Sequence, residues 1–172
     1  MSQTLRIIFI LCILALAPVS GHAATNESLY DAKTAEKLDV SKIPLFGPQS
    51  GKFRYDARMV HAAEIAAARA HKHSTSRCWH FVKDALVAAH IIPSRPVTEY
   101  AKEAGGELTS SFGFQKLGES DPYKAPLGSV IVYGGKGAGH VELRTEQGFV
   151  SDFVSATPST RPLIGIYIKP KV

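Results

Sequence analysis

One stretch, CWHFVKDALVAA at residues 78–89, decides how the rest of the chain must fold. Its apolar side chains recur at helical spacing. They are Cys78, Val82, Ala85, Leu86 and Ala89. Ser74-Thr75-Ser76 stand just before it and are residue types that cap helix starts. We therefore predict a buried-faced helix from about Arg77 to Ala89, with Cys78 in its first turn.

The elements on either side of this helix predict an α+β domain. An alanine-rich helix is expected from Tyr55 to about His71, and a weaker helix from Val97 to Ala104, closed by Gly105-Gly106. Strand patterns occupy 129–133, 140–145, 149–155 and 163–169. Helices first and strands second predict N-terminal helices packed on an antiparallel β-meander.

The start of the chain resembles a secretory leader. Arg6 is the only charge in residues 1–23, and the apolar run after it is too short to span a bilayer comfortably. Gly21-His22-Ala23 predicts cleavage after Ala23, which removes Cys12 with the leader. The expected organisation is a signal peptide over 1–23, an irregular arm over 24–54 and one domain over 55–172. The expected location is periplasmic or secreted.

The charge balance of the chain excludes some partners. The net charge of +5 is scattered, and no basic run or nucleic-acid-binding motif is present. A mildly basic protein would approach an anionic envelope polymer readily. We expect no nucleic-acid partner, and no membrane partner once the leader is removed.

Cys78 would be the only thiol of the mature chain, so it cannot form an internal disulfide. It is then buried and inert, cross-linked to another chain, or reactive. The free backbone N–H groups at a helix start favour thiolate over thiol, and the residue's own N–H can bind an oxyanion. The sequence around Cys78 favours a reactive thiol.

A thiolate nucleophile needs an imidazole to move its proton, and His140 is the candidate among seven histidines. It opens a predicted strand after the glycine-rich loop 134–139, where it could reach a helix N-terminus. The other histidines have simpler roles on helices or leave with the leader. His71-Lys72-His73 lacks a further ligand at motif spacing, so no metal or cofactor is expected.

Three segments together resemble the NlpC and CHAP cysteine peptidoglycan hydrolases. They are residues 78–86, GSVIVY at 128–133 and GHVEL at 139–143, within a region of about 70–155. The resemblance implies a papain-like domain in which Cys78 is the nucleophile and His140 the base. It also implies a polar third residue on the neighbouring strand, and cleavage of amide bonds in cell-wall peptides.

The residue that orients His140 depends on the register of a hairpin. If Glu146-Gln147-Gly148 forms a three-residue loop, Thr145 pairs with Phe149 and Asp152 becomes a diagonal neighbour of His140. A two-residue loop would put Asp152 behind the sheet. We predict the longer loop, because Gly148 suits a positive φ, with Asp152 as third residue and Glu142 as runner-up.

The sequence thus predicts a papain-like NlpC/CHAP-type hydrolase with Cys78, His140 and Asp152 as its site. It would be an exported cysteine amidase or endopeptidase acting on peptidoglycan stem peptides, with an inhibitor or immunity protein as a possible partner. The alternative is a non-catalytic envelope-binding or inhibitory domain on the same fold. The sequence does not indicate which peptidoglycan bond is cut.

Overall fold

An antiparallel sheet forms the centre of residues 54–171, which are the residues that the structure, a computed structural model, describes. The expected signal peptide, residues 1–23, and the expected arm up to residue 53 lie outside the described residues. Both therefore stay predictions.

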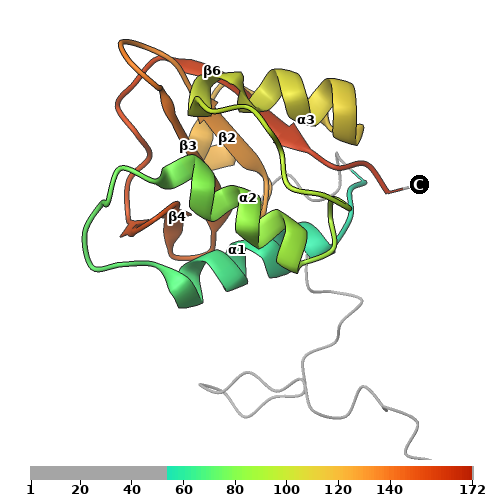
Figure 1. The fold of residues 1–172 in the computed structure, drawn as a ribbon, viewed down its shortest axis with the longest axis horizontal. Coiled ribbons are helices and arrows are strands. Elements are labelled where there is room, and N and C mark those ends of the chain that lie inside the picture. Colours follow the sequence, from blue (N-terminus) through green and yellow to red (C-terminus); the bar gives the residue numbers. More distant parts are fainter. Residues whose placement is uncertain (1–53, 172) are drawn as a thin grey trace, which may run out of the picture. The chain divides into compact units, whose positions relative to one another are not determined.

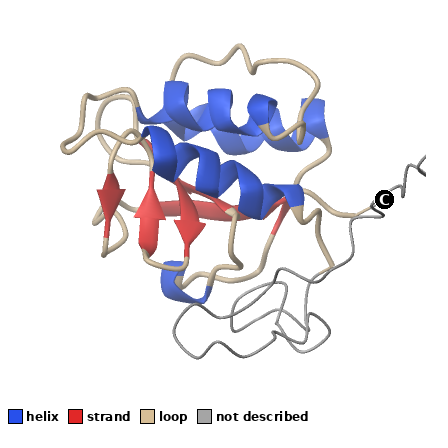
Figure 2. Cartoon of the chain, turned by 90° about the horizontal axis from the view of Figure 1, so that it is seen from below, coloured by secondary structure: helices blue, strands red, loops and turns tan. Residues whose placement is uncertain are grey.

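The longer helices cover one side of this sheet, and a short helix lies on its other side, as Figure 2 shows; Figure 1 labels the main elements. The helices are α1 (Arg58–Arg69), α2 (Cys78–Ala88), η1 (Ala101–Glu103), α3 (Ala104–Phe112) and η2 (Pro122–Lys124). The strands are β1 (Gln115–Lys116), β2 (Val130–Tyr133), β3 (His140–Thr145), β4 (Gly148–Val150), β5 (Val154–Ser155) and β6 (Leu163–Ile168). In this part of the chain no helix is long and apolar enough to cross a membrane.

The strand order, β1-β6-β2-β3-β4-β5, agrees with an α+β fold and refines the expected meander. The strands β2 to β5 pair in sequence, but β6 returns to pair with β2 on its other side. The run expected at 149–155 is split into β4 and β5. Residues 151–153 interrupt it, where the Ser151 N–H donates to the carbonyl of Phe153.

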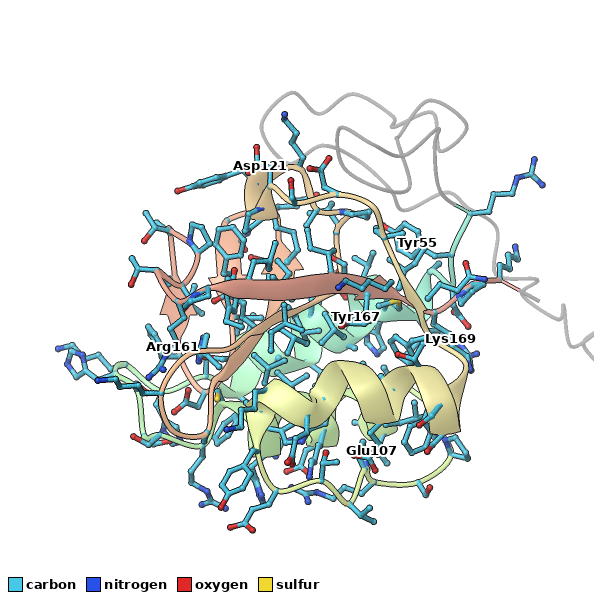
Figure 3. The ribbon with its side chains drawn as sticks, turned by 90° about the horizontal axis from the view of Figure 1, so that it is seen from above. Tyr55, Glu107, Asp121, Arg161, Tyr167 and Lys169 are labelled. Atoms are coloured by element: carbon cyan, nitrogen blue, oxygen red, sulfur yellow. The ribbon has the colours of Figure 1, made fainter. Side chains whose placement is uncertain are left out.

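The third helix lies further along the chain than predicted. It runs through Gly105-Gly106 rather than ending there. A Cβ at position 105 would lie 2.3 Å from the ring of Tyr167, which belongs to β6 and is labelled in Figure 3. Glycine at this position therefore lets α3 approach the sheet closely, and it does not mark a helix end.

The β3–β4 hairpin also differs from the prediction. Thr145 pairs with Gly148, so the loop has two residues, Glu146 and Gln147, and the three-residue register is wrong. Gly148 has a φ of +139°, and a Cβ there would lie 2.3 Å from the carbonyl oxygen of Ser155. Contact with β5, rather than a left-handed turn, is the reason for glycine here.

The core fixes α2 against the sheet and so fixes the place of its first residue. Val82 and Leu86 of α2 and Met59 of α1 are fully buried, together with Val141 and Leu143 of β3. Each fully buried side chain of this kind contributes about 1.5–3 kcal/mol to folding. The N-terminus of α2 is therefore held rigidly beside the start of β3.

Gly128 gives a direct test of this packing. It has a φ of +79°, and a Cβ there would lie 2.4 Å from the carbonyl carbon of Met59 in α1. We expect Gly128→Ala to lower the free energy of unfolding by about 2 kcal/mol or more, since backbone strain and a backbone clash add. Urea denaturation measures the change.

Gly106→Ala is the matched control for that measurement. Position 106 lies inside α3, and a Cβ there would meet nothing within 4 Å. The alanine should raise stability by about 0.5–1 kcal/mol, because glycine loses more backbone entropy in a helix. Equal stabilities for the two variants would contradict the close approach of α1 to residue 128.

Candidate active site

Cys78 and His140, the two residues predicted to react, lie side by side where α2 and β3 begin. Cys78 is the first residue of α2 and is partly exposed. His140 is the first residue of β3, and its side chain is 16% exposed. The Cys78 side chain lies close enough to the imidazole to raise its pKa. The fold therefore brings a thiol at a helix start together with a histidine at a strand end.

Glu142, not Asp152, is the carboxylate next to His140. Its Oε2 lies 3.3 Å from His140 Nε2, and its side chain is only 4% exposed. The Tyr133 hydroxyl donates a hydrogen bond of 2.5 Å to the other oxygen, Oε1, which also accepts from the backbone N–H of Ser159 at 3.4 Å. Tyr133 lies opposite His140 in the β2–β3 register. The imidazole is thus held from one side by a buried and well-bonded carboxylate.

Opposing effects set the pKa of His140. Burial lowers it, but hydrogen bonds and charges from Cys78 and Glu142 outweigh burial and raise the pKa to about 9. Burial and the hydrogen bond to Glu142 also raise the pKa of Tyr133, so its phenol stays a donor. The imidazole is therefore protonated at neutral pH in the free protein.

Asp152 is fully buried and binds the loop that leads into α2. Its Oδ2 accepts from the backbone N–H groups of Thr75, at 2.5 Å, and Arg77, at 3.2 Å. It also accepts from the Ser74 and Thr75 hydroxyls. The prediction that Asp152 lies beside His140 is wrong. In the two-residue register β4 ends at Val150, and the turn at 151–153 directs the chain toward residues 74–77.

These hydrogen bonds give Asp152 a structural role at the site, in place of the predicted contact with His140. Burial raises the pKa of its carboxyl, but the donors from Thr75 and Arg77 outweigh that effect and lower the pKa. The carboxylate is thus charged and anchors the residue directly before Cys78. The sequence signal for this contact is Ser74-Thr75-Ser76, whose donors need an acceptor; the prediction assigned them to helix capping alone.

A cleft of about 280 Å³ opens beside His140 and Glu142. Ser74 and Phe153 line one part of it, and residues 155–161 line the rest. Arg161, at the exposed end of that segment, precedes β6 (Figure 3). Sequence reasoning missed this wall, although SATPST at 155–160 is a hydroxyl-rich run. The cleft offers a substrate many hydrogen-bonding groups and the guanidinium of Arg161 beside the imidazolium of His140.

Two other histidines of the described residues have partners of their own. His61 contacts Glu64 on α1, and His80 lies among arginines on an exposed face of α2. Within residues 54–171, no three His, Cys, Asp or Glu side chains converge in a way that could hold a metal ion.

The fold and the site together define a class of protein: an α+β domain in which a cysteine at a helix start lies beside a histidine at a strand start. A scan against family models finds no match, and a search of curated proteins finds no significant one. Among solved structures, the domain is similar to a chain of the type VI native effector–immunity complex Tae3–Tai3 from Ralstonia pickettii. The TM-score is 0.53 at 25% identity, over 64% of this chain and 98% of that chain.

A second match is to the selenomethionine form of the same complex. It has 29% identity and covers 55% of this chain and 80% of that chain, with a TM-score of 0.46. The first match shows an overall likeness of fold across nearly the whole of the other chain.

The anchoring role of Asp152 predicts the effect of Asp152→Asn. The amide keeps the shape but loses the charge that the donors at 74–77 face, so the free energy of unfolding should fall by about 2 kcal/mol. Because the folded-state pKa is lowered, this contribution is present above the unfolded value of 3.8 and is lost as pH falls below it. Denaturation of both proteins at several pH values measures it. A stability difference that persists undiminished under strongly acidic conditions would contradict the assignment.

Proposed function

We propose that the chain is an exported cysteine amidase or endopeptidase that hydrolyses amide bonds in peptidoglycan. One observation carries the proposal: the series Cys78–His140–Glu142, in which the imidazole lies between a helix-start thiol and a buried carboxylate, and of which His140 and Glu142 line a cleft. The class of substrate is supported by the resemblance of residues 78–86, 128–133 and 139–143 to NlpC and CHAP hydrolases. It is supported further by the likeness of the fold to a type VI effector complex.

The geometry supports a division of roles within the site. Glu142 contacts Nε2 of the imidazole, which leaves Nδ1 for the thiol. The proton shared between Cys78 and His140 resides on the imidazole once the thiolate forms. Glu142 stabilises that imidazolium, and Tyr133 keeps Glu142 in place. In this arrangement Cys78 is the nucleophile, His140 the proton carrier and Glu142 the orienting residue in place of Asp152.

The reaction then follows two balanced steps. The Cys78 thiolate attacks the amide carbon, and the backbone N–H at the start of α2 stabilises the resulting oxyanion. The imidazolium of His140 gives its proton to the leaving nitrogen as the C–N bond breaks, which leaves a thioester. The neutral imidazole next takes a proton from water, which attacks the thioester and releases the acid. The thiolate and the imidazolium are both restored.

The walls of the cleft favour a polar, anionic peptide. Hydroxyl groups of Ser74, Ser155 and Ser159 surround it, and Arg161 supplies a positive charge. A guanidinium pairs well with a free carboxylate. Stem peptides of peptidoglycan carry such carboxylates beside their amide bonds, so they suit this cleft better than an apolar peptide would.

The proposal includes export and a protein partner. The predicted leader would deliver the enzyme to the periplasm or beyond. The matching structures are effector–immunity complexes, and a similar inhibitor for this chain would have to cover the same cleft. An inhibitor that binds there protects a cell wall from its own enzyme.

Cys78→Ala tests the nucleophile. Purified peptidoglycan is incubated with each protein, and the soluble fragments are identified by mass spectrometry. The wild-type chain should release peptides, and the variant should be slower by about 10³-fold or more, since loss of a nucleophile removes the covalent route. Circular dichroism shows that the variant is folded. Release at the wild-type rate would remove Cys78 from the mechanism, whereas wild-type binding without release would support the non-catalytic alternative.

Glu142→Gln tests the orienting residue through the pH profile. The imidazolium of His140 is needed to protonate the leaving group, so kcat/KM of the wild type should fall as pH rises past about 9. Glutamine removes a charge that raises this pKa, so the alkaline limb should move to lower pH. The rate at its optimum should fall about 10²-fold.

Glu146→Gln is the matched control, because this substitution removes the same charge from the exposed β3–β4 loop. Its profile should superimpose on that of the wild type. An alkaline limb that stays in place in Glu142→Gln would show that Glu142 does not act on His140.

A further inference from the structure

Three arginines lie near Asp84 and His80 on an exposed face of α2, outside the cleft lining: Arg69 and Arg95 beside the carboxylate, and Arg77 beside the imidazole. Arg95 Nε donates to Asp84 Oδ1 at 2.8 Å, and Arg69 NH2 lies 4.0 Å from Asp84 Oδ2. Arg77 NH2 lies 3.1 Å from Nε2 of His80, which stands one turn before Asp84. One carboxylate cannot balance three guanidinium charges, so the cluster keeps a surplus of positive charge.

The ring of His80 cannot satisfy the two arginines that face it. Nε2 lies 3.4 Å from Asp84 Oδ2, and Nδ1 lies 2.6 Å from Arg95 NH2. A neutral imidazole has one N–H donor and one acceptor nitrogen. If Nε2 carries the proton, it donates to Asp84 and Arg77 faces a donor; if Nδ1 carries it, Arg95 faces a donor instead. In either tautomer one of the two guanidinium groups has a donor that the ring does not accept.

The surrounding charges keep His80 neutral. Burial lowers its pKa, and Arg95 and Arg77 lower it further, against the opposing effect of Asp84. Protonation of the ring would leave even more donors without acceptors. The cluster therefore has exposed donors and surplus positive charge that are available to an additional acceptor with negative charge near Arg77 and its neighbours.

We propose that Arg77, Arg95 and Arg69 bind a phosphate group, and that this phosphate belongs to an anionic polymer of the cell envelope. The phosphates of such a polymer carry negatively charged non-bridging oxygens, which pair bidentately with guanidinium groups and offset the surplus positive charge of the cluster. The side chains of Arg69 and Arg95 are 51% and 42% exposed, which leaves them accessible to a polymer.

The position of the cluster indicates what binding there would do for the enzyme, and this step rests on the proposed function. Arg77 directly precedes Cys78, but His80 points to another side of α2 than the thiol does. A polymer held by the cluster would therefore lie close to the cleft without entering it. Such an anchoring site keeps the enzyme on the wall while the cleft receives successive peptides.

Binding is measured with the Cys78→Ala protein, so that the result does not depend on whether Cys78 cleaves anything. The probes are inorganic phosphate, a polyglutamate peptide, and phosphate-bearing wall material before and after its phosphates are removed chemically. NMR signals of the His80 ring and the arginine Nε–H groups locate the site, and calorimetry gives the affinity. We expect inorganic phosphate to shift these signals, and untreated wall to bind at least about tenfold more tightly than phosphate-stripped wall.

Three substitutions and one control complete the experiment. Arg77→Gln and Arg95→Gln should each weaken binding of untreated wall about tenfold or more, and Arg95→Lys should weaken it less, because a charge remains without the planar fork. Arg54→Gln, at an exposed position outside α2 and outside the cluster, removes the same charge and should leave binding unchanged. Circular dichroism checks that each variant is folded.

Several results would overturn the proposal. Equal binding of stripped and untreated wall, or an equal loss in Arg54→Gln, would leave only non-specific attraction. Tighter binding of polyglutamate than of phosphate-bearing wall would assign the cluster to an acidic protein instead. Inorganic phosphate binding as tightly as the wall would make it a site for free phosphate.

Discussion

The structure depends on a buried carboxylate that ties two distant parts of the chain together. Asp152 follows β4, yet its oxygens accept hydrogen bonds from the backbone of residues 75 and 77, just before α2. A buried charge is costly unless it is paired or well bonded, so this arrangement tolerates little displacement. The first turn of α2 is thereby held against the sheet, and with it the thiol that meets His140. Neither the helix nor the strand alone would define that meeting point.

A second carboxylate, Glu142, contacts the histidine itself. The sequence predicted one acid beside the histidine, but two acids position the site. Glu142 sets the charge and direction of the imidazole, whereas Asp152 sets the position of the helix that carries the thiol. Tyr133 is part of the first arrangement, because its hydroxyl occupies one oxygen of Glu142 and leaves the other for the ring. The site is thus supported from two strands and one loop.

The sequence revealed the parts of this arrangement that depend on local patterns. The apolar stripe of α2, the β-branched run at 129–133 and the alternation at 140–145 are local, and so they identified the helix and the strands that carry Cys78 and His140. The hairpin register and the role of Asp152 depend on contacts between distant residues. Gly148 resembled a turn residue, but its contact with Ser155 explains it, and Gly105 resembled a helix end because Tyr167 could not be seen beside it. The arginine cluster was only partly visible, since Arg77, His80 and Asp84 lie at helical spacing but Arg69 and Arg95 come from outside α2.

The segment at 155–161 contributes both to the wall of the cleft and to the hydrogen bonds that hold Glu142. Its hydroxyl groups and Arg161 form a wall of the cleft, and the backbone N–H of Ser159 also donates to Glu142. A change in this segment that reshaped the cleft would therefore also alter how firmly Glu142 is held beside the histidine. Substitutions that preserve the path of the backbone at residue 159 can change the lining of the cleft alone, whereas insertions or deletions there would disturb the cleft and the carboxylate together.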